Sequence, residues 1–161
     1  MSTITTRPLG PEDWRLYRTV RLTALADAPE AFGATWADES TFPEEKWKDR
    51  LGRRNSFVAV RDGEACGLVG VVPLDSRVAG LVSMWVAPGA RSQGVGGLLV
   101  ARALEWAADN GFPEVRLWVS EGNDRAERLY SRQGFRRTGE VQLIRDGEDA
   151  EEFAMSRHAG P

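Results

Sequence analysis

The chain has 161 residues, enough for one domain with a substantial core and too few for two. Its formal net charge of −3 argues against a nucleic-acid or membrane-surface protein, and a single cysteine, Cys66, excludes an internal disulfide. One histidine, His158, leaves no histidine cluster for a metal, and no apolar run of about twenty residues and no signal peptide is present. We therefore expect a soluble, cytoplasmic, metal-free protein with one domain over residues 1–161.

The N-terminal third of the sequence predicts one strand and two helices. Ile4–Arg7 is a short strand, and a helix begins at Pro11, whose fixed φ and following acids suit a first turn. Apolar residues then recur at helical spacing as far as Ala26. Residues 29–40 show no period and predict a loop, after which the capping box Thr41-x-x-Glu44 begins a second, short helix.

The middle of the chain predicts an antiparallel meander of three strands. Ser56–Arg61 and Glu64–Leu74 flank Asp62-Gly63, a dipeptide favoured in hairpin turns, and the third strand covers Ala79–Val86. Two glycines inside the second strand predict a bend or bulge there.

A basic, glycine-rich turn follows the third strand and indicates the kind of ligand. The strand runs into Pro88, the turn covers Arg91–Gly94, and helical periodicity begins at Val95. The first N–H groups of a helix have no intrahelical partner and the helix dipole is positive there, so this junction suits phosphate. The turn is not a Walker loop, because Leu98 follows Gly97, and it does not fit a dinucleotide fingerprint. We expect a ligand that carries phosphates.

The C-terminal part predicts two more helices and three more strands. The helix from Val95 ends at Asn110-Gly111, and Glu114–Val119 is a strand that can lie parallel to the central one through a right-handed crossover. Another helix and two strands follow, over Asp124–Gln133, Phe135–Val141 and Ala150–Arg157. The predicted order is β-α-α-β-β-β-α-β-α-β-β, an α/β (α+β) fold of seven strands and about four helices.

Two motifs in this order resemble one enzyme family. The first is Arg91-x-x-Gly94-x-Gly96, and the second is Asn-x-x-Ala-x-x-x-Tyr-x-x-x-Gly-Phe over residues 123–135. Together they resemble the GNAT superfamily of acetyl-coenzyme A-dependent N-acetyltransferases. The resemblance implies the GNAT fold with a mixed, mostly antiparallel sheet, acetyl-CoA as co-substrate and an amine acceptor. Members of the family often form dimers through their last strands, so a homodimer is an open alternative.

The resemblance also implies which residues hold the coenzyme. In the family, the pantetheine arm lies between the central strand and the helix of the second motif. Backbone groups of Met84 and Val86 would bond this arm, and residues 93–97 would wrap the pyrophosphate. The implied coenzyme-binding residues are Met84, Trp85, Val86, Arg91, Ser92, Gln93, Gly94, Val95, Gly96, Gly97, Asn123 and Tyr130. Arg128 and Arg132 either reach the ribose phosphate or form a solvated basic face.

Acetyl transfer to an amine requires a neutral amine, a polarised carbonyl and a proton donor for the thiolate. Freeing an amine of pKa about 10.4 at neutral pH costs about 4.6 kcal/mol. Tyr130 is the candidate general acid because the resemblance places it at the thiolate, and it is otherwise a half-buried aromatic residue. A backbone N–H within Met84–Val86 can polarise the carbonyl. Asn123 is either a coenzyme ligand or a helix N-cap.

The general base is less well defined by the sequence. Glu39 is the leading candidate, with Asp38 and Glu121 behind it, and each is otherwise a solvated surface acid. Three tryptophans either form an aromatic wall for the acceptor amine or pack in the core. They are Trp36, Trp85 and Trp118.

The function predicted from these residues is direct transfer of acetyl from acetyl-CoA to a primary amine of a small molecule or peptide. The alternatives are a non-catalytic acyl-CoA sensor module and a protein lysine or N-terminal acetyltransferase. Cys66 is expected to be a small buried strand residue rather than a nucleophile, and His158 an exposed tail residue.

Overall fold

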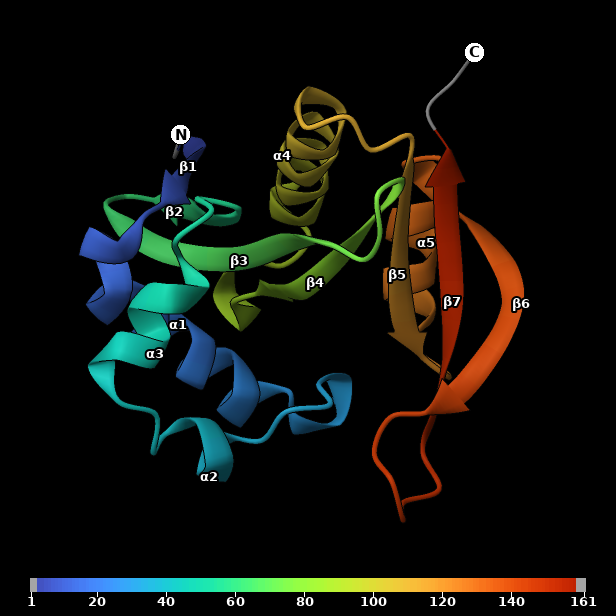
Figure 1. Cartoon of the computed structure of the whole chain (residues 1–161), viewed down its shortest axis with the longest axis horizontal. Coiled ribbons are helices and arrows are strands. Elements are labelled where there is room, and N and C mark those ends of the chain that lie inside the picture. The colour runs from blue at the N-terminus through green and yellow to red at the C-terminus, as the bar shows by residue number, and fades with distance from the viewer. Residues whose placement is uncertain (1–2, 159–161) are drawn as a thin grey trace.

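A computed structural model describes residues 3–158 as strands, α-helices and short 3-10 helices (Figure 1). The strands are β1 (Ile4–Leu9), β2 (Ser56–Arg61), β3 (Glu64–Pro73), β4 (Val78–Val86), β5 (Glu114–Ser120), β6 (Arg136–Leu143) and β7 (Glu151–His158). The α-helices are α1 (Trp14–Asp27), α2 (Trp36–Glu39), α3 (Glu44–Arg50), α4 (Val95–Asp109) and α5 (Asp124–Arg132). The 3-10 helices are η1 (Pro11–Asp13), η2 (Pro29–Ala31) and η3 (Pro88–Ala90). None of these helices is long and apolar enough to cross a membrane.

All seven strands belong to one sheet of order β1-β2-β3-β4-β5-β7-β6. β4 and β5 are parallel, and every other neighbouring pair is antiparallel. This confirms the predicted α/β fold with a mixed, mostly antiparallel sheet. The described residues contain five α-helices rather than about four, because the segment predicted as a loop includes α2.

The N-terminal third differs from the prediction in its details. Residues 11–13 form η1 instead of opening α1, since the Asp13 carboxylate accepts a hydrogen bond from the Gly10 N–H at 3.0 Å. The capping box predicted at Thr41 is wrong, because its hydroxyl donates to the Asp38 carbonyl at 2.7 Å and Pro43 occupies the N-cap of α3. The strand boundaries agree closely, except that β7 extends through His158, an exposed strand residue rather than a tail residue.

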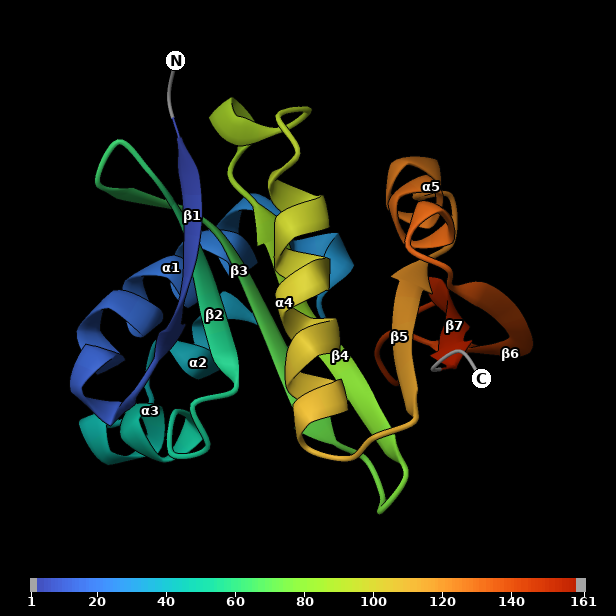
Figure 2. The same cartoon turned by 90° about the horizontal axis from the view of Figure 1, so that it is seen from above.

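The helices cover both faces of the sheet and bury two cores. Figure 1 shows α4 on one side of β1–β4 and α1–α3 on the other, while Figure 2 shows α5 beside β5 and β7. The core under α4 and α5 includes the fully buried Leu99 and Phe135. The core under α1 and α3 includes the fully buried Trp47 and Leu51. Apolar burial on both faces of β1–β4 makes this half of the sheet a rigid support for the adjoining site.

The sheet opens between β4 and β5. These strands pair only over three residues, Val78, Ala79 and Gly80 of β4, and then diverge (Figure 1). Along the diverging part, β4 carries a bulge in which Ser83 and Met84 both oppose a single residue of β3. Ser83 adopts the left-handed φ of 59° there. On the side away from β3, the backbone groups of β4 beyond Gly80 therefore face an opening and not a neighbouring strand.

Candidate active site

One cavity of about 540 Å³ lies in this opening on the side of α4 and α5. We call it the coenzyme cleft. Its lining combines the end of β4, the glycine-rich turn and one face of α5. The lining includes all the predicted coenzyme-binding residues except one: Met84, Trp85, Val86, Arg91, Ser92, Gly94, Val95, Gly96, Gly97, Asn123 and Tyr130. Arg128 and Arg132 line it as well.

The glycine-rich turn presents main-chain groups to this cleft. Gly94 is the N-cap of α4 in the left-handed conformation, with φ 83°, and no side chain caps the helix. The first N–H groups of α4 therefore lack an intrahelical acceptor and open onto the cleft. A Cβ at Gly96 would lie 2.9 Å from Leu129 Cδ2, so a larger residue would press against α5 across the cleft. Geometry of this kind suits a diphosphate.

Arg91 and Gln93 make contacts that the motif did not predict. Arg91 donates to the Asp27 carboxylate at 2.7 Å and to the Val86 carbonyl at 3.1 Å. Gln93 does not line the cleft, because its side chain accepts from Arg61 at 2.6 Å on the outer side of the turn. Arg91 thus borders the cleft while paired with α1, and Gln93 supports the turn from behind.

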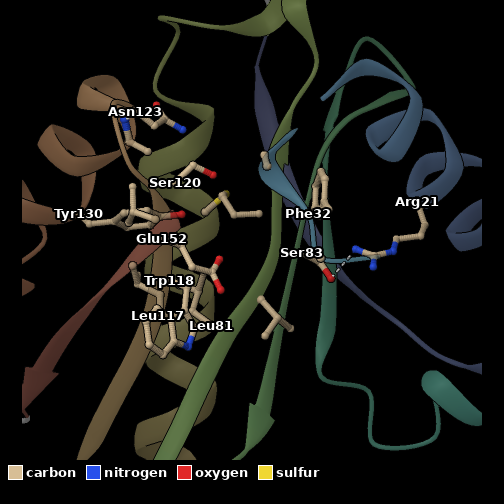
Figure 3. A pocket seen from close by; sticks show the side chains of 16 residues that line it. Arg21, Phe32, Leu81, Ser83, Leu117, Trp118, Ser120, Asn123, Tyr130 and Glu152 are labelled. Atoms are coloured by element: carbon tan, nitrogen blue, oxygen red, sulfur yellow. Dashed lines mark hydrogen bonds between the residues drawn. The ribbon is translucent and has the colours of Figure 1, made fainter. Parts of the chain in front are cut away.

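Tyr130 lies where the coenzyme cleft meets a second cavity. It is 5% exposed, and its ring packs edge-on against Phe135. Burial raises the pKa of the Tyr130 phenol well above its ordinary value, so the hydroxyl stays protonated at neutral pH. Its side chain points into the opening (Figure 3), and the hydroxyl has no hydrogen-bond partner among residues 3–158. It is a free donor aimed at the junction of the two cavities.

Asn123 is a helix cap in the structure. Its Oδ1 accepts from the Ala126 N–H at 3.2 Å at the start of α5. The same residue lines both cavities. The cap uses one lone pair of Oδ1, so the amide nitrogen of Asn123 and the second lone pair of Oδ1 remain for a ligand.

The second cavity, of about 310 Å³, lies on the side of α1 and η2, and we call it the acceptor pocket. Figure 3 shows Trp118 and Glu152 entering it from β5 and β7, with Arg21 and Phe32 facing them from the α1 side. The pocket therefore has the carboxylate of Glu152 on one wall and the guanidinium of Arg21 on the other.

Sequence reasoning missed both of these charged residues. The pairing of Ser120 with Glu152 between β5 and β7 brings the Glu152 carboxylate to the pocket. Its Oε2 accepts from Gln142 at 2.7 Å, leaving Oε1 toward the cavity. No local signal marks Glu152, because the direction of its side chain depends on the β5–β7 register.

Glu39 does not lie in the acceptor pocket. It is 3% exposed, and both its oxygens accept hydrogen bonds from Arg21, at 2.9 and 3.1 Å, and from Arg50, at 3.0 and 3.3 Å. Burial raises the pKa of the Glu39 carboxyl, but the hydrogen bonds and charges of the two guanidinium groups outweigh it and the net shift is downward. A carboxylate occupied in this way is a weak proton acceptor.

The other predicted residues of the acceptor side do not come together. Asp38 and Glu121 are exposed and outside the pocket lining, and Trp36 is exposed on α2. Trp85 is buried and donates to Asp27 at 2.9 Å, so only Trp118 of the three tryptophans borders the acceptor pocket. The aromatic wall is therefore not formed. Cys66 is a buried β3 residue, and burial raises the pKa of its thiol.

The acetyltransferase (GNAT) family model matches residues 21–135, and the chain belongs to this family. The resemblance carried by the two sequence motifs is thereby confirmed. A mycothiol acetyltransferase from Thermomonospora curvata is 33% identical over 135 residues, covering 83% of this chain and 44% of that protein. The chain thus spans less than half of that relative.

One further sequence relative and two solved structures are similar to this chain. An uncharacterised N-acetyltransferase from Archaeoglobus fulgidus is 33% identical over 98 residues, covering 57% of this chain and 67% of that protein. A GNAT-family acetyltransferase from Streptococcus pneumoniae superposes with TM-score 0.78 at 20% identity, over 98% of this chain and 100% of that one. YncA from Salmonella typhimurium, solved with its cofactor acetyl-CoA, superposes with TM-score 0.78 at 18% identity, over 99% and 98% of the chains.

Proposed function

We propose that the chain is an N-acetyltransferase that moves acetyl from acetyl-CoA directly to a primary amine of a small molecule. The observation that carries this proposal is the meeting of two cavities at one unpartnered tyrosine. The coenzyme cleft and the acceptor pocket both include Tyr130 in their linings, so a thioester from one side and an amine from the other can meet there.

The residues of the coenzyme cleft fit acetyl-CoA. Main-chain N–H groups at the start of α4 would hold the pyrophosphate, and backbone groups of Met84–Val86 would hold the pantetheine arm. Arg128 and Arg132 supply further positive charge on the α5 wall. When bound, the coenzyme supplies a thioester whose carbonyl carbon accepts the amine and whose sulfur departs as a thiolate.

Tyr130 has the role of donor to the departing sulfur in this proposal. A phenol with a raised pKa stays protonated and donates a strong hydrogen bond to a developing anion in a site that excludes water. Full proton transfer from such a phenol is uphill, so the hydrogen bond is the main contribution. Backbone N–H groups near the Ser83–Met84 bulge, which have no β5 partner, are placed to polarise the carbonyl.

Glu152 replaces Glu39 as the proposed proton acceptor. Its carboxylate faces the acceptor pocket, whereas both oxygens of Glu39 are bonded to arginines. Glu152 would receive the amine proton directly or through one water as the nitrogen attacks. Glu39 then serves as a support for Arg21 and takes no proton.

The test measures release of free coenzyme A thiol with acetyl-CoA and a panel of primary amines. Tyr130→Phe is expected to lower kcat about 100-fold while the Kd for coenzyme A stays within about threefold, since only the hydroxyl is removed. Tyr17→Phe is the matched control, because Tyr17 packs against Trp47 in the other core. Glu152→Gln is expected to lower kcat/KM about 100-fold, with the exposed neighbour variant Glu151→Gln unchanged.

Two outcomes would contradict the proposal. Tight binding of coenzyme A without thiol release for any amine would indicate a non-catalytic acyl-CoA sensor. Full activity in Tyr130→Phe would remove the assigned role of the phenol.

A further inference from the structure

We infer that the acceptor is a small zwitterion that carries a primary amine and a carboxylate a few bonds apart, as amino acids do. This inference rests on the proposed function and adds the substrate class. It follows from the opposed charges on the two walls of the acceptor pocket, from its size and from the way it is closed.

The acidic wall holds the amine. Glu152 is half-buried on β7, and Gln142 fixes one of its oxygens at 2.7 Å, so the carboxylate is oriented by the sheet. Ser120 lies beside it on β5, and the Trp118 indole, 39% exposed, borders the same pocket. An ammonium group arriving here meets a carboxylate and an aromatic face before it loses its proton near Tyr130.

The basic wall holds the carboxylate. Arg21 is 7% exposed and lines the pocket, with Nη1 bonded to the Ser83 hydroxyl at 3.0 Å and Nε and Nη2 bonded to Glu39. Each terminal nitrogen of a guanidinium carries two hydrogens, so both keep one donor beyond these bonds. The Phe32 ring lies 5.2 Å from the guanidinium carbon and limits its movement.

The charge of the basic wall is not neutralised by its own cluster. Arg21 and Arg50 together carry two positive charges, and Glu39 between them carries one negative charge, so the cluster has a net charge of +1. Arg21 is the buried cation of this cluster and Arg50 is partly exposed, so the unbalanced charge beside the pocket favours an anionic partner for Arg21. The carboxylate of the acceptor would supply that partner, whereas a polyamine would place a second cation against Arg21.

The size and closure of the acceptor pocket favour a small molecule over a polypeptide. Arg145, from the β6–β7 connection, donates to the backbone carbonyls of Pro29, Phe32 and Gly33 at 2.6, 2.8 and 3.3 Å. The Ser120 hydroxyl donates to the Glu30 carbonyl at 3.3 Å. These contacts connect η2 to the other half of the sheet across the pocket, whose volume of about 310 Å³ is at the low end for ligand sites.

The experiment compares matched triplets of acceptors in the thiol-release assay. Each triplet shares one side chain and consists of the amino acid, its amide and the decarboxylated amine, for apolar, aromatic, acidic and basic side chains. The amide has the least basic amine of the three, so a preference for the amino acid over its amide cannot arise from a larger fraction of free base, and this pair carries the conclusion about the carboxylate. We expect kcat/KM for at least one amino acid to exceed both partners by about 10-fold or more, the size of one charged hydrogen-bond pair.

Variants of the basic wall test the source of that preference. Arg21→Gln is expected to reduce the ratio of kcat/KM between amino acid and amide to about 3-fold or less. Arg21→Gln with Glu39→Gln removes both charges of the buried pair and keeps the protein foldable if the single variant is unstable. Arg18→Gln, on the same helix and outside the pocket lining, is the control that keeps the wild-type ratio.

The outcomes separate this inference from the proposed function. Turnover of amides or simple amines as fast as of every amino acid would overturn the zwitterion while leaving an N-acetyltransferase. An unchanged amino acid-to-amide ratio in both Arg21 variants would also overturn it. Absence of thiol release with all members of all triplets and with the wider amine panel would instead contradict the proposed function.

Discussion

Glu39→Ala tests whether this carboxylate supports the fold or takes part in the chemistry. Arg21 is only 7% exposed in the structure. Removing the Glu39 carboxylate leaves Arg21 with the Ser83 hydroxyl as its remaining side-chain hydrogen-bond acceptor among the described residues. Loss of one partner of a buried ion pair costs about 3–5 kcal/mol. Because Arg50 is partly exposed and can be hydrated, we expect the lower end, about 3 kcal/mol. At a urea m-value of about 2 kcal/mol/M, the unfolding midpoint falls by about 1.5 M.

Urea unfolding followed by tryptophan fluorescence measures this change, with Asp38→Ala as the exposed neighbouring control. The pKa of Glu39 is lowered in the fold, so its contribution is complete above the ordinary carboxyl pKa and is lost as the pH falls through the folded value. The difference between wild type and Glu39→Ala should therefore shrink in acid. A midpoint unchanged at pH 7, together with loss of acetyl transfer, would refute this reasoning and restore Glu39 as a base.

Three further predictions concern the cleft, the closure of the acceptor pocket and the thiol. Gly96→Val should weaken coenzyme A binding about 10-fold or more in calorimetry, because its side chain presses on α5, while Gly89→Ala, with open space around it, binds normally. Arg145→Ala should raise the acceptor KM about 5-fold or more with little change in coenzyme Kd, and equal KM values for it and for the exposed Arg136→Ala would contradict the closure. Cys66 should resist iodoacetamide at pH 7.5 until urea unfolds the protein, and rapid labelling of the native protein would show that the thiol is not buried.

The course of the chain around the glycine-rich turn could be predicted from sequence, because the strand, the turn and the helix follow one another directly. The glycine at the start of α4 and the i, i+3, i+7 spacing along α5 are features of short stretches of chain, whereas the close approach of Gly96 to Leu129 is a contact between two helices. The prediction for Gln93 failed to anticipate its orientation, because the contact with Arg61 joins residues from different strands and turns. The motif predicts the main-chain conformation of this turn, but it does not predict the directions of the side chains on it.

The acceptor side depends on long-range packing and was predicted poorly. Glu152 reaches the pocket through the register of β7 on β5, and a shift of one residue would turn its side chain to the opposite face. Glu39 looked like a loop acid, but three helices bring Arg21 and Arg50 to it. Thr41 matched a capping box and instead closes the turn after α2, where Pro43 already begins the next helix. In each of these cases a tertiary contact decides the position of the side chain, and a rule for local structure does not describe it.

The short seam between β4 and β5 has an evolutionary consequence. Three residue pairs join β4 to β5, and the glycine-rich turn belongs entirely to the half of the sheet that contains β4 and α4. The acceptor pocket takes one wall from each half, including the β7 face and the segment after α1. Mutations in those outer segments change the lining of the acceptor pocket and leave the glycine-rich turn unaltered, so the two cavities can diverge at different rates.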